Sequence, residues 1–226
     1  KPKGYTPSAD TGKKMVTKND VFVYDAVKTP QFWLVWTVLF VNTTAGIGVL
    51  GQASAMSQEM FPGHITAIAA AGLVGLMSLF NMGGRFSWAS LSDYIGRKNT
   101  YFVYMCLGFV MYITVPYAGG SGNVVLFVCC FLIIVSMYGG GFSTVPAYLR
   151  DLFGTRYVGA IHGILLTAWS AAGKAQAYNT TMYIMAGLFI VGFICNLAIR
   201  AVDSKWHMKK PGEVDAGAAD AVPSRA

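Results

Sequence analysis

The sequence predicts an all-α polytopic membrane protein, folded as a bundle of six transmembrane helices. Hydrophobic residues make up 54% of the 226 residues and charged residues only 12%, about half the charged share of a soluble globular protein. Residues 31–58, 60–84, 99–149 and 175–199 contain no Asp, Glu, Lys or Arg. So much apolar chain leaves too few polar residues to cover it in water, which excludes an ordinary soluble protein.

The positions of the basic residues give a second indication. If six apolar stretches cross a membrane in turn, every one of the 17 Lys and Arg residues except Lys174 falls on the same side. Because basic residues are retained in cytoplasmic loops, both termini are expected in the cytoplasm and the protein in the inner cell membrane. A net charge of +7 would suggest a nucleic-acid partner in a soluble protein. Here the charge follows the topology and faces anionic lipid instead.

Six stretches are long enough to approach the length of a membrane span, which needs about 20 apolar residues in helical form. In order they are Phe32–Gly51, Ile65–Gly84 with an extension to about residue 88, Tyr101–Ala118, Val124–Tyr148, Tyr157–Gly173 and Met182–Ala201.

Local signals support each of these elements in turn. Thr29-Pro30 precedes the first span, and proline suits the start of a helix. A longer loop over residues 52–64 leads to the second span, and only residues 119–123 join the third and fourth. Gly139-Gly140-Gly141 is expected to interrupt the fourth span, because helices disfavour glycine. The fifth span covers only about 25 Å, against a bilayer core of about 30 Å.

Polar segments flank the bundle at both ends. Residues 1–30 are expected to form a cytoplasmic segment, residues 31–202 the bundle, and residues 203–226 a disordered cytoplasmic tail. The chain begins at Lys1 without an initiator methionine, so it is expected to be a fragment of a longer protein.

Neither a cofactor nor a metal is expected, and the chain has no hydrolase nucleophile arrangement or phosphate-binding glycine loop that would indicate an enzyme. The cysteines lie inside apolar stretches without metal-ligand spacing and are expected to be packing residues. They are Cys106, Cys129, Cys130 and Cys195.

The strongest local motif lies between the second and third spans, in residues 88–98. Gly96 permits a tight turn there, and Asp93 can cap a helix or pair with a cation such as Arg97 or Lys98. We expect Asp93, Gly96, Arg97 and Lys98 to form a gate that holds one conformation closed on the cytoplasmic side. The alternative is an ordinary basic loop.

Arg85 is the leading candidate for binding a substrate. On a continuous helix it lies eight residues, or about 12 Å, deeper than Asp93. A cation at mid-membrane costs about 2.5 to 3.5 kcal/mol, so it is best retained where it faces a polar cavity and a carboxylate. The alternative is an arginine that extends to the interface.

Other polar residues in the spans carry weaker signals. Asn81 and Gln52 can line a cavity, although hydrogen bonding to a neighbouring helix is the commoner role. His162 stands alone in the fifth span, where packing is commoner than a proton relay.

Several runs resemble known transporters. Residues 88–98 resemble the loop motif of the major facilitator superfamily at Asp93, Gly96, Arg97 and Lys98, with Ala89 replacing a glycine and Tyr94 an arginine. From about Tyr5 to Val202 the chain resembles the C-terminal six of twelve spans of the oxalate/formate antiporter family. The matching runs are Phe32-Trp33-Leu34, Gly46-Ile47-Gly48, Gly84-Arg85-Phe86, Val145-Pro146-Ala147 and Asp151-Leu152-Phe153-Gly154.

The resemblance implies one half of a secondary transporter for a small organic anion, working by alternating access. The partner would be a missing N-terminal half of six spans or a second copy of the chain. It also implies a substrate-binding role for Arg85, to which we add Trp169, Asn81 and Gln52 as candidates. Oxalate-carrying members have Lys where this chain has Trp169, so a monocarboxylate such as formate, lactate or pyruvate is expected.

Two other functions remain open. The family carries a stretch after Gly173 that this chain lacks, so the chain is alternatively a truncated, non-transporting membrane remnant or scaffold. A channel is less favoured, because the sequence shows no charged ring or carbonyl filter.

Overall fold

The computed structural model describes residues 17, 19–172 and 180–208, with backbone only for 180–183. The helices are α1 (Val23–Lys28), α2 (Pro30–Met60), α3 (Ala67–Ile95), α4 (Arg97–Gly120), α5 (Val124–Phe153), α6 (Val158–Leu165), α7 (Thr167–Ala172) and α8 (Thr180–Ala198), followed by a 3₁₀ turn at Ser204–Trp206. The described part contains no β-strand, only an isolated bridge between Val21 and His207. The predicted all-α class is confirmed.

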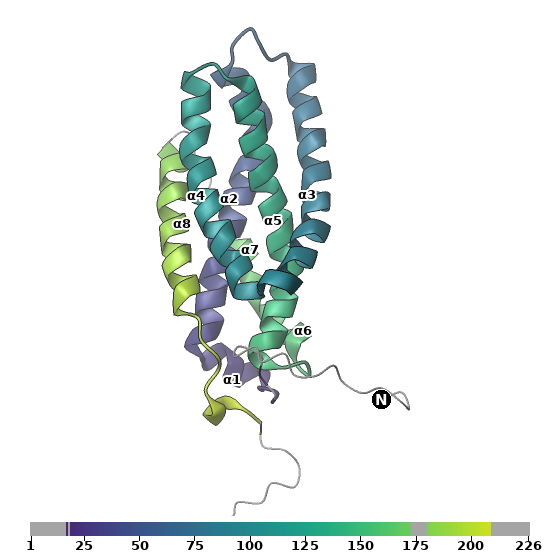
Figure 1. The fold of residues 1–226 in the computed structure, drawn as a ribbon, viewed down its shortest axis with the longest axis vertical. Coiled ribbons are helices and arrows are strands. Elements are labelled where there is room, and N and C mark those ends of the chain that lie inside the picture. Colours follow the sequence, from purple (N-terminus) through teal and green to yellow (C-terminus); the bar gives the residue numbers. More distant parts are fainter. Residues whose placement is uncertain (1–16, 18, 173–179, 209–226) are drawn as a thin grey trace, which may run out of the picture.

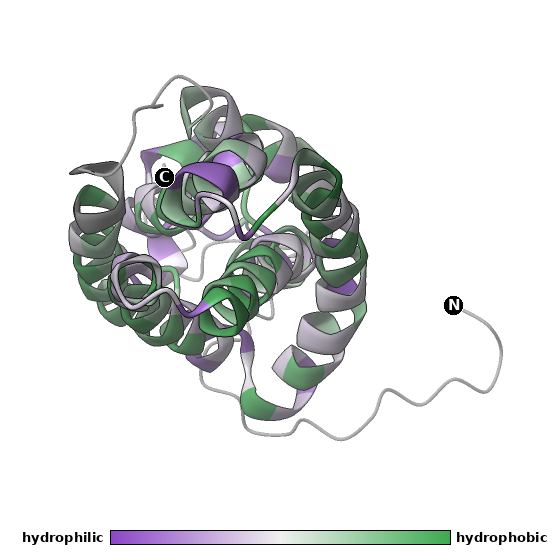
Figure 2. Ribbon diagram, turned by 90° about the horizontal axis from the view of Figure 1, so that it is seen from above, coloured by the Kyte–Doolittle hydropathy of each residue, from purple (hydrophilic) through white to green (hydrophobic). Residues whose placement is uncertain are grey.

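The long helices run alongside one another as an up-and-down bundle (Figure 1). By length and composition, α2, α3, α4 and α5 are each able to cross a membrane, and two shorter apolar helical segments cover residues 158–172 and 184–198. Hydrophobic residues lie on outward as well as inward faces (Figure 2), among them the exposed Leu79, Val110 and Ile194. A helix in water would keep such residues on one face only, so the bundle is built for lipid.

Short polar side chains fix where the long helices begin. The Thr29 hydroxyl accepts a hydrogen bond from the Phe32 amide at 3.3 Å, next to Pro30 in the first turn of α2. Thr66 and Asn123 cap α3 and α5 in the same way. Such caps satisfy amides that have no partner within the helix.

Two glycine turns and most of the described cations lie at one end of the bundle, which we call the basic end. Gly96 and Gly154 have positive φ angles of 88° and 85°, and they end α3 and α5 there. The basic end also carries α1 and the residues that follow α8 (Figure 1). The connections over residues 61–66 and 121–123 lie at the opposite end.

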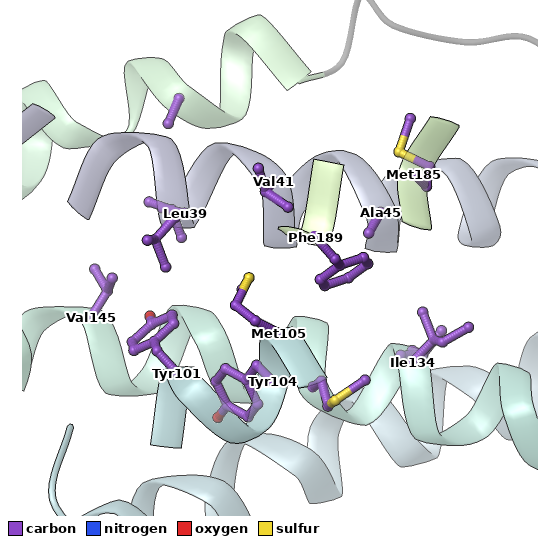
Figure 3. Close-up of a cluster of buried hydrophobic side chains, with 14 of the residues drawn as sticks. Leu39, Val41, Ala45, Tyr101, Tyr104, Met105, Ile134, Val145, Met185 and Phe189 are labelled. Atoms are coloured by element: carbon purple, nitrogen blue, oxygen red, sulfur yellow. The ribbon is translucent and has the colours of Figure 1, made fainter. Parts of the chain in front are cut away.

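The core lies where α2, α4, α5 and α8 meet. Figure 3 shows Leu39, Val41 and Ala45 of α2 facing α4 and α5, with Phe189 of α8 against them. The large buried side chains include Tyr101, Tyr104 and Phe131.

Gly139-Gly140-Gly141 does not interrupt the fourth span, so this expectation was wrong. The helix α5 continues unbroken from Val124 to Phe153. A Cβ at Gly139 would collide with the carbonyl oxygen of Asn81 on α3, and one at Gly141 with the Asn42 side chain on α2. The glycines let two neighbouring helices approach α5, and this packing outweighs their low helix propensity.

The fifth predicted span is broken as well as short. Its helix divides into α6 and α7 at Leu166, and the two pieces together cover about 22 Å at about 1.5 Å per residue. The Trp36 indole donates a hydrogen bond to the Thr167 hydroxyl at 2.9 Å, which ties the start of α7 to α2. Gly173 and Lys174 lie outside the described residues.

Candidate substrate pocket and gating loop

A pocket of about 640 Å³ lies between α2, α5 and α7. Tyr138, which lines it, stands at the middle of α5. The lining is mainly apolar and aromatic, and it consists of Ile47, Leu50, Gly51, Tyr138, Trp169 and Ser170. Such a wall suits the apolar part of a small molecule.

Aromatic rings shape one side of this pocket. A Cβ at Gly46 would collide with the Tyr138 ring, so glycine at this position lets the ring lie against α2. Phe142 contacts both Tyr138 and Trp169 edge-on, with ring centroids 5.2 and 6.4 Å apart. The rings therefore support one another and Trp169 lines the pocket, while its role in substrate binding stays a prediction.

Arg85 lies on α3, the helix that packs against α5. The Arg85 backbone carbonyl accepts a hydrogen bond from the Ser143 hydroxyl at 2.9 Å, which holds this turn of α3 against α5. The charge of Arg85 acts on the Tyr138 hydroxyl across the packed helices α3 and α5. Arg85 itself is exposed and forms no ion pair with a described residue. One cation without an ion-pair partner among the described residues thus stands on α3, next to the helix that carries Tyr138 of the pocket.

Asn81 and Gln52 occupy different surroundings from the lining residues. Asn81 lies one turn before Arg85 on α3, with its carbonyl and side-chain oxygens against Gly139. Gln52 is half-buried on α2, directly after the lining residue Gly51. Their roles in substrate binding stay predictions.

The sequence analysis missed Tyr138, Ile47 and Leu50 as site residues. Tyr138 stands well inside α5, which extends beyond it on both sides. A large aromatic residue directly before three glycines was the available signal, because glycines mark the places where neighbouring helices approach.

The loop predicted to act as a gate folds into one compact turn. Arg97 forms an ion pair with Asp93 and a hydrogen bond with the Ser92 hydroxyl. The Gly96 amide donates to the Ser92 carbonyl at 3.1 Å, which closes the end of α3. Three of the four predicted motif residues are therefore brought together.

Lys98 turns away from this cluster toward α8. Its Nζ donates to the carbonyl oxygens of Leu197 at 2.9 Å and Ile199 at 2.7 Å. The Asn196 side chain returns a hydrogen bond to the Lys98 carbonyl at 3.0 Å. The last carbonyls of a helix have no partner within it, so Lys98 caps α8 from another helix.

Within the described residues, no group of three or more His, Cys, Asp and Glu side chains is arranged to hold a metal ion. The four cysteines are free thiols.

Comparison with curated proteins gives three relatives of interest. The oxalate:formate antiporter of Oxalobacter formigenes is 28% identical over 175 residues, which is 76% of this chain and 40% of that relative. An uncharacterized MFS-type transporter, YhjX, of Escherichia coli (strain K12) is 23% identical over 66% of this chain and 36% of its own length. Apicoplast pyruvate carrier 1 of Toxoplasma gondii is 25% identical over 71% of this chain and 29% of its own length.

The chain thus spans 40% or less of the length of these relatives. The family model described as Major Facilitator Superfamily matches residues 2–177, which include the gating loop, Arg85 and the pocket residues. This is a family of membrane transporters rather than enzymes. On this match, the chain belongs to the Major Facilitator Superfamily.

Proposed function

We propose that the chain forms one half of a secondary transporter that carries a small monocarboxylate by alternating access. The observation that carries the proposal is one cation, Arg85, on the helix that packs against α5, whose Tyr138 lines an aromatic and apolar pocket. A single carboxylate matches a single guanidinium. A second carboxylate would lie against Ile47, Leu50 or Trp169, where a charge without a partner is costly.

The relatives support the substrate class. Two of them are named for oxalate and formate or for pyruvate, all of them small carboxylates. Pyruvate and formate each carry one negative charge, which the arrangement around Arg85 favours over oxalate.

The proposal requires a second half. Because the relatives are more than twice as long as the matched region, the partner is an N-terminal half of six spans or a second copy. In transporters of this kind the two halves rock around a central site. The basic end faces the cytoplasm of the cell, as its charge favours, and the Asp93–Arg97 turn forms part of the gate there.

A second candidate is a membrane remnant that carries nothing. The short helices α6 and α7 favour it, because together they fall about 8 Å short of a bilayer core of about 30 Å. Trp169 and Ser170 of the pocket lie on α7, so a poorly seated α7 would also impair the site.

Uptake into proteoliposomes distinguishes the two. We expect saturable uptake of labelled formate, lactate or pyruvate, and a loss of about 10- to 100-fold in kcat/KM in Arg85→Ala, because a hydrogen bond to a charged group contributes about 1.5 to 3 kcal/mol. Arg156→Ala, at the basic end, is the matched control. Saturable oxalate exchange that depends on Arg85 would overturn the monocarboxylate assignment. Absence of uptake for all four anions, with and without a co-expressed N-terminal half, would favour the remnant.

A further inference from the structure

Most described cations at the basic end have a partner of opposite charge or an aromatic ring. Lys28, Arg97, Arg150 and Lys205 form ion pairs with aspartates, and Arg156 lies over the Tyr157 ring. Within the described part of the chain, three cations have neither kind of partner: Arg85, Lys98 and Arg200. Arg85 belongs to the candidate substrate site, so the other two need a separate account.

Lys98 contacts the backbone directly before Arg200. The Lys98 Nζ is 2.7 Å from the carbonyl oxygen of Ile199, the residue directly before Arg200. The charge of Arg200 acts on Lys98, and two like charges at short range repel each other. Lys98 has three N–H donors and uses two on carbonyls of α8. One donor therefore remains on Lys98, near the exposed residue Arg200.

An apolar strip leads away from this pair toward the middle of the bundle. Phe102 lies one turn beyond Lys98 on α4, and Leu197 and Ile194 lie on α8; these side chains are 41%, 49% and 60% exposed. The rings of Phe102 and Phe193 are 5.0 Å apart, so the two helices present one continuous surface. Figure 1 shows α4 and α8 side by side along this edge.

We propose that Lys98 and Arg200 bind the phosphate of an anionic phospholipid, with its acyl chains along Phe102, Ile194 and Leu197. A phosphate between the two cations relieves their repulsion and accepts hydrogen bonds from both, and arginine is suited to bidentate phosphate binding. The apolar strip favours a lipid over a soluble phosphate, because only a lipid also covers that surface. Lys98 stands at the start of α4 and also caps the end of α8. The bound lipid therefore joins the start of α4 to the end of α8. This site lies apart from the substrate pocket and does not depend on the proposed transport activity.

The test measures binding of phosphatidylglycerol to the purified chain in mixed micelles, by native mass spectrometry and by thermal unfolding. Phosphatidylcholine, inorganic phosphate and glycerol phosphate are run alongside. We expect phosphatidylglycerol alone to bind and to raise the unfolding temperature. Arg200→Gln is expected to weaken that binding about five-fold, as each basic residue near an anionic headgroup contributes about 1 kcal/mol.

Arg156→Gln is the matched control, since it removes one charge from the same end of the bundle beside an aromatic ring only. It should leave phosphatidylglycerol binding within two-fold of the parent, a limit of about 0.4 kcal/mol. Arg200→Lys, which keeps the charge, should retain most of the binding. Equal weakening in Arg156→Gln and Arg200→Gln, equal binding of phosphatidylcholine, or equal stabilisation by inorganic phosphate would each overturn the proposed lipid site.

Discussion

Arg85 shows how far a single residue can be placed from sequence. Its spacing from Asp93 predicted a cation well inside the membrane on one helix, and α3 is indeed continuous over both residues. Tyr138, the pocket residue on which the charge of Arg85 acts, comes from another helix. Contacts between helices depend on side-chain packing in three dimensions, which spacing along one helix does not specify.

Tyr138→Phe tests whether the hydroxyl links Arg85 to the pocket. The ring and its contact with Phe142 remain, and only the hydrogen-bonding group is lost. We expect KM for the monocarboxylate to rise about three- to ten-fold with little change in kcat, since a single hydrogen bond contributes about 0.5 to 1.5 kcal/mol. Tyr148→Phe is the control, because the buried Tyr148 hydroxyl has no hydrogen-bond partner in the structure. Equal KM changes in both variants would remove Tyr138 from the site.

Trp169→Lys tests the choice of substrate charge. A second cation on α7 supplies a partner for a second carboxylate and introduces an unpaired charge when a monocarboxylate is bound. We expect the ratio of oxalate to formate uptake to rise about ten-fold or more, measured by competition in proteoliposomes. Trp169→Phe keeps an apolar wall and should not shift the ratio. A rise in both variants would mean that pocket size rather than charge selects the substrate.

At the scale of elements, apolar runs and composition were sufficient to predict where the long helices lie. They were not sufficient to predict how these helices pack. Caps at Thr29 and the glycine turn at Gly96 follow from local chemistry, so they could be anticipated. The continuity of α5 could not, because helix propensity argues against Gly139-Gly140-Gly141 and only the close approach of α2 and α3 explains it. The break at Leu166 likewise carries no local signal in the form of glycine or proline.

Gly139→Ala and Gly75→Ala form a matched pair that isolates this packing. Alanine normally stabilises a helix by about 0.5 to 1 kcal/mol relative to glycine. Gly75 has nothing within 4 Å of an added Cβ, so its variant should be neutral or stabilised. At Gly139 the Cβ meets the Asn81 backbone, and we expect destabilisation by about 1 to 3 kcal/mol. Thermal unfolding in detergent measures the stability of both variants. Equal changes in their unfolding temperatures would show that α3 does not contact α5 closely at Gly139.

At the scale of the whole molecule, α3 is the least covered of the long helices. Only 22% of the apolar stretch of α3 that could span a membrane is buried, against 56% of the corresponding stretches of α2 and α5. Leu79, Phe80 and Phe86 are exposed on the same helix as Arg85. Lipid can cover the apolar residues, but Arg85 is better accommodated by a polar cavity. The exposure of α3 therefore supports a second half on this side of the bundle.

The orientation of the molecule can be tested with single cysteines in a variant whose four cysteines are replaced by alanine. Lys28→Cys marks the basic end, and His64→Cys marks the opposite end in the connection between α2 and α3; both positions are exposed. Because basic residues are retained inside during insertion, a membrane-impermeant maleimide should label His64→Cys in intact cells and Lys28→Cys only after the membrane is opened. Labelling of Lys28→Cys in intact cells would reverse the topology and place the Asp93–Arg97 turn outside. Labelling of both positions would indicate that the chain inserts in two orientations.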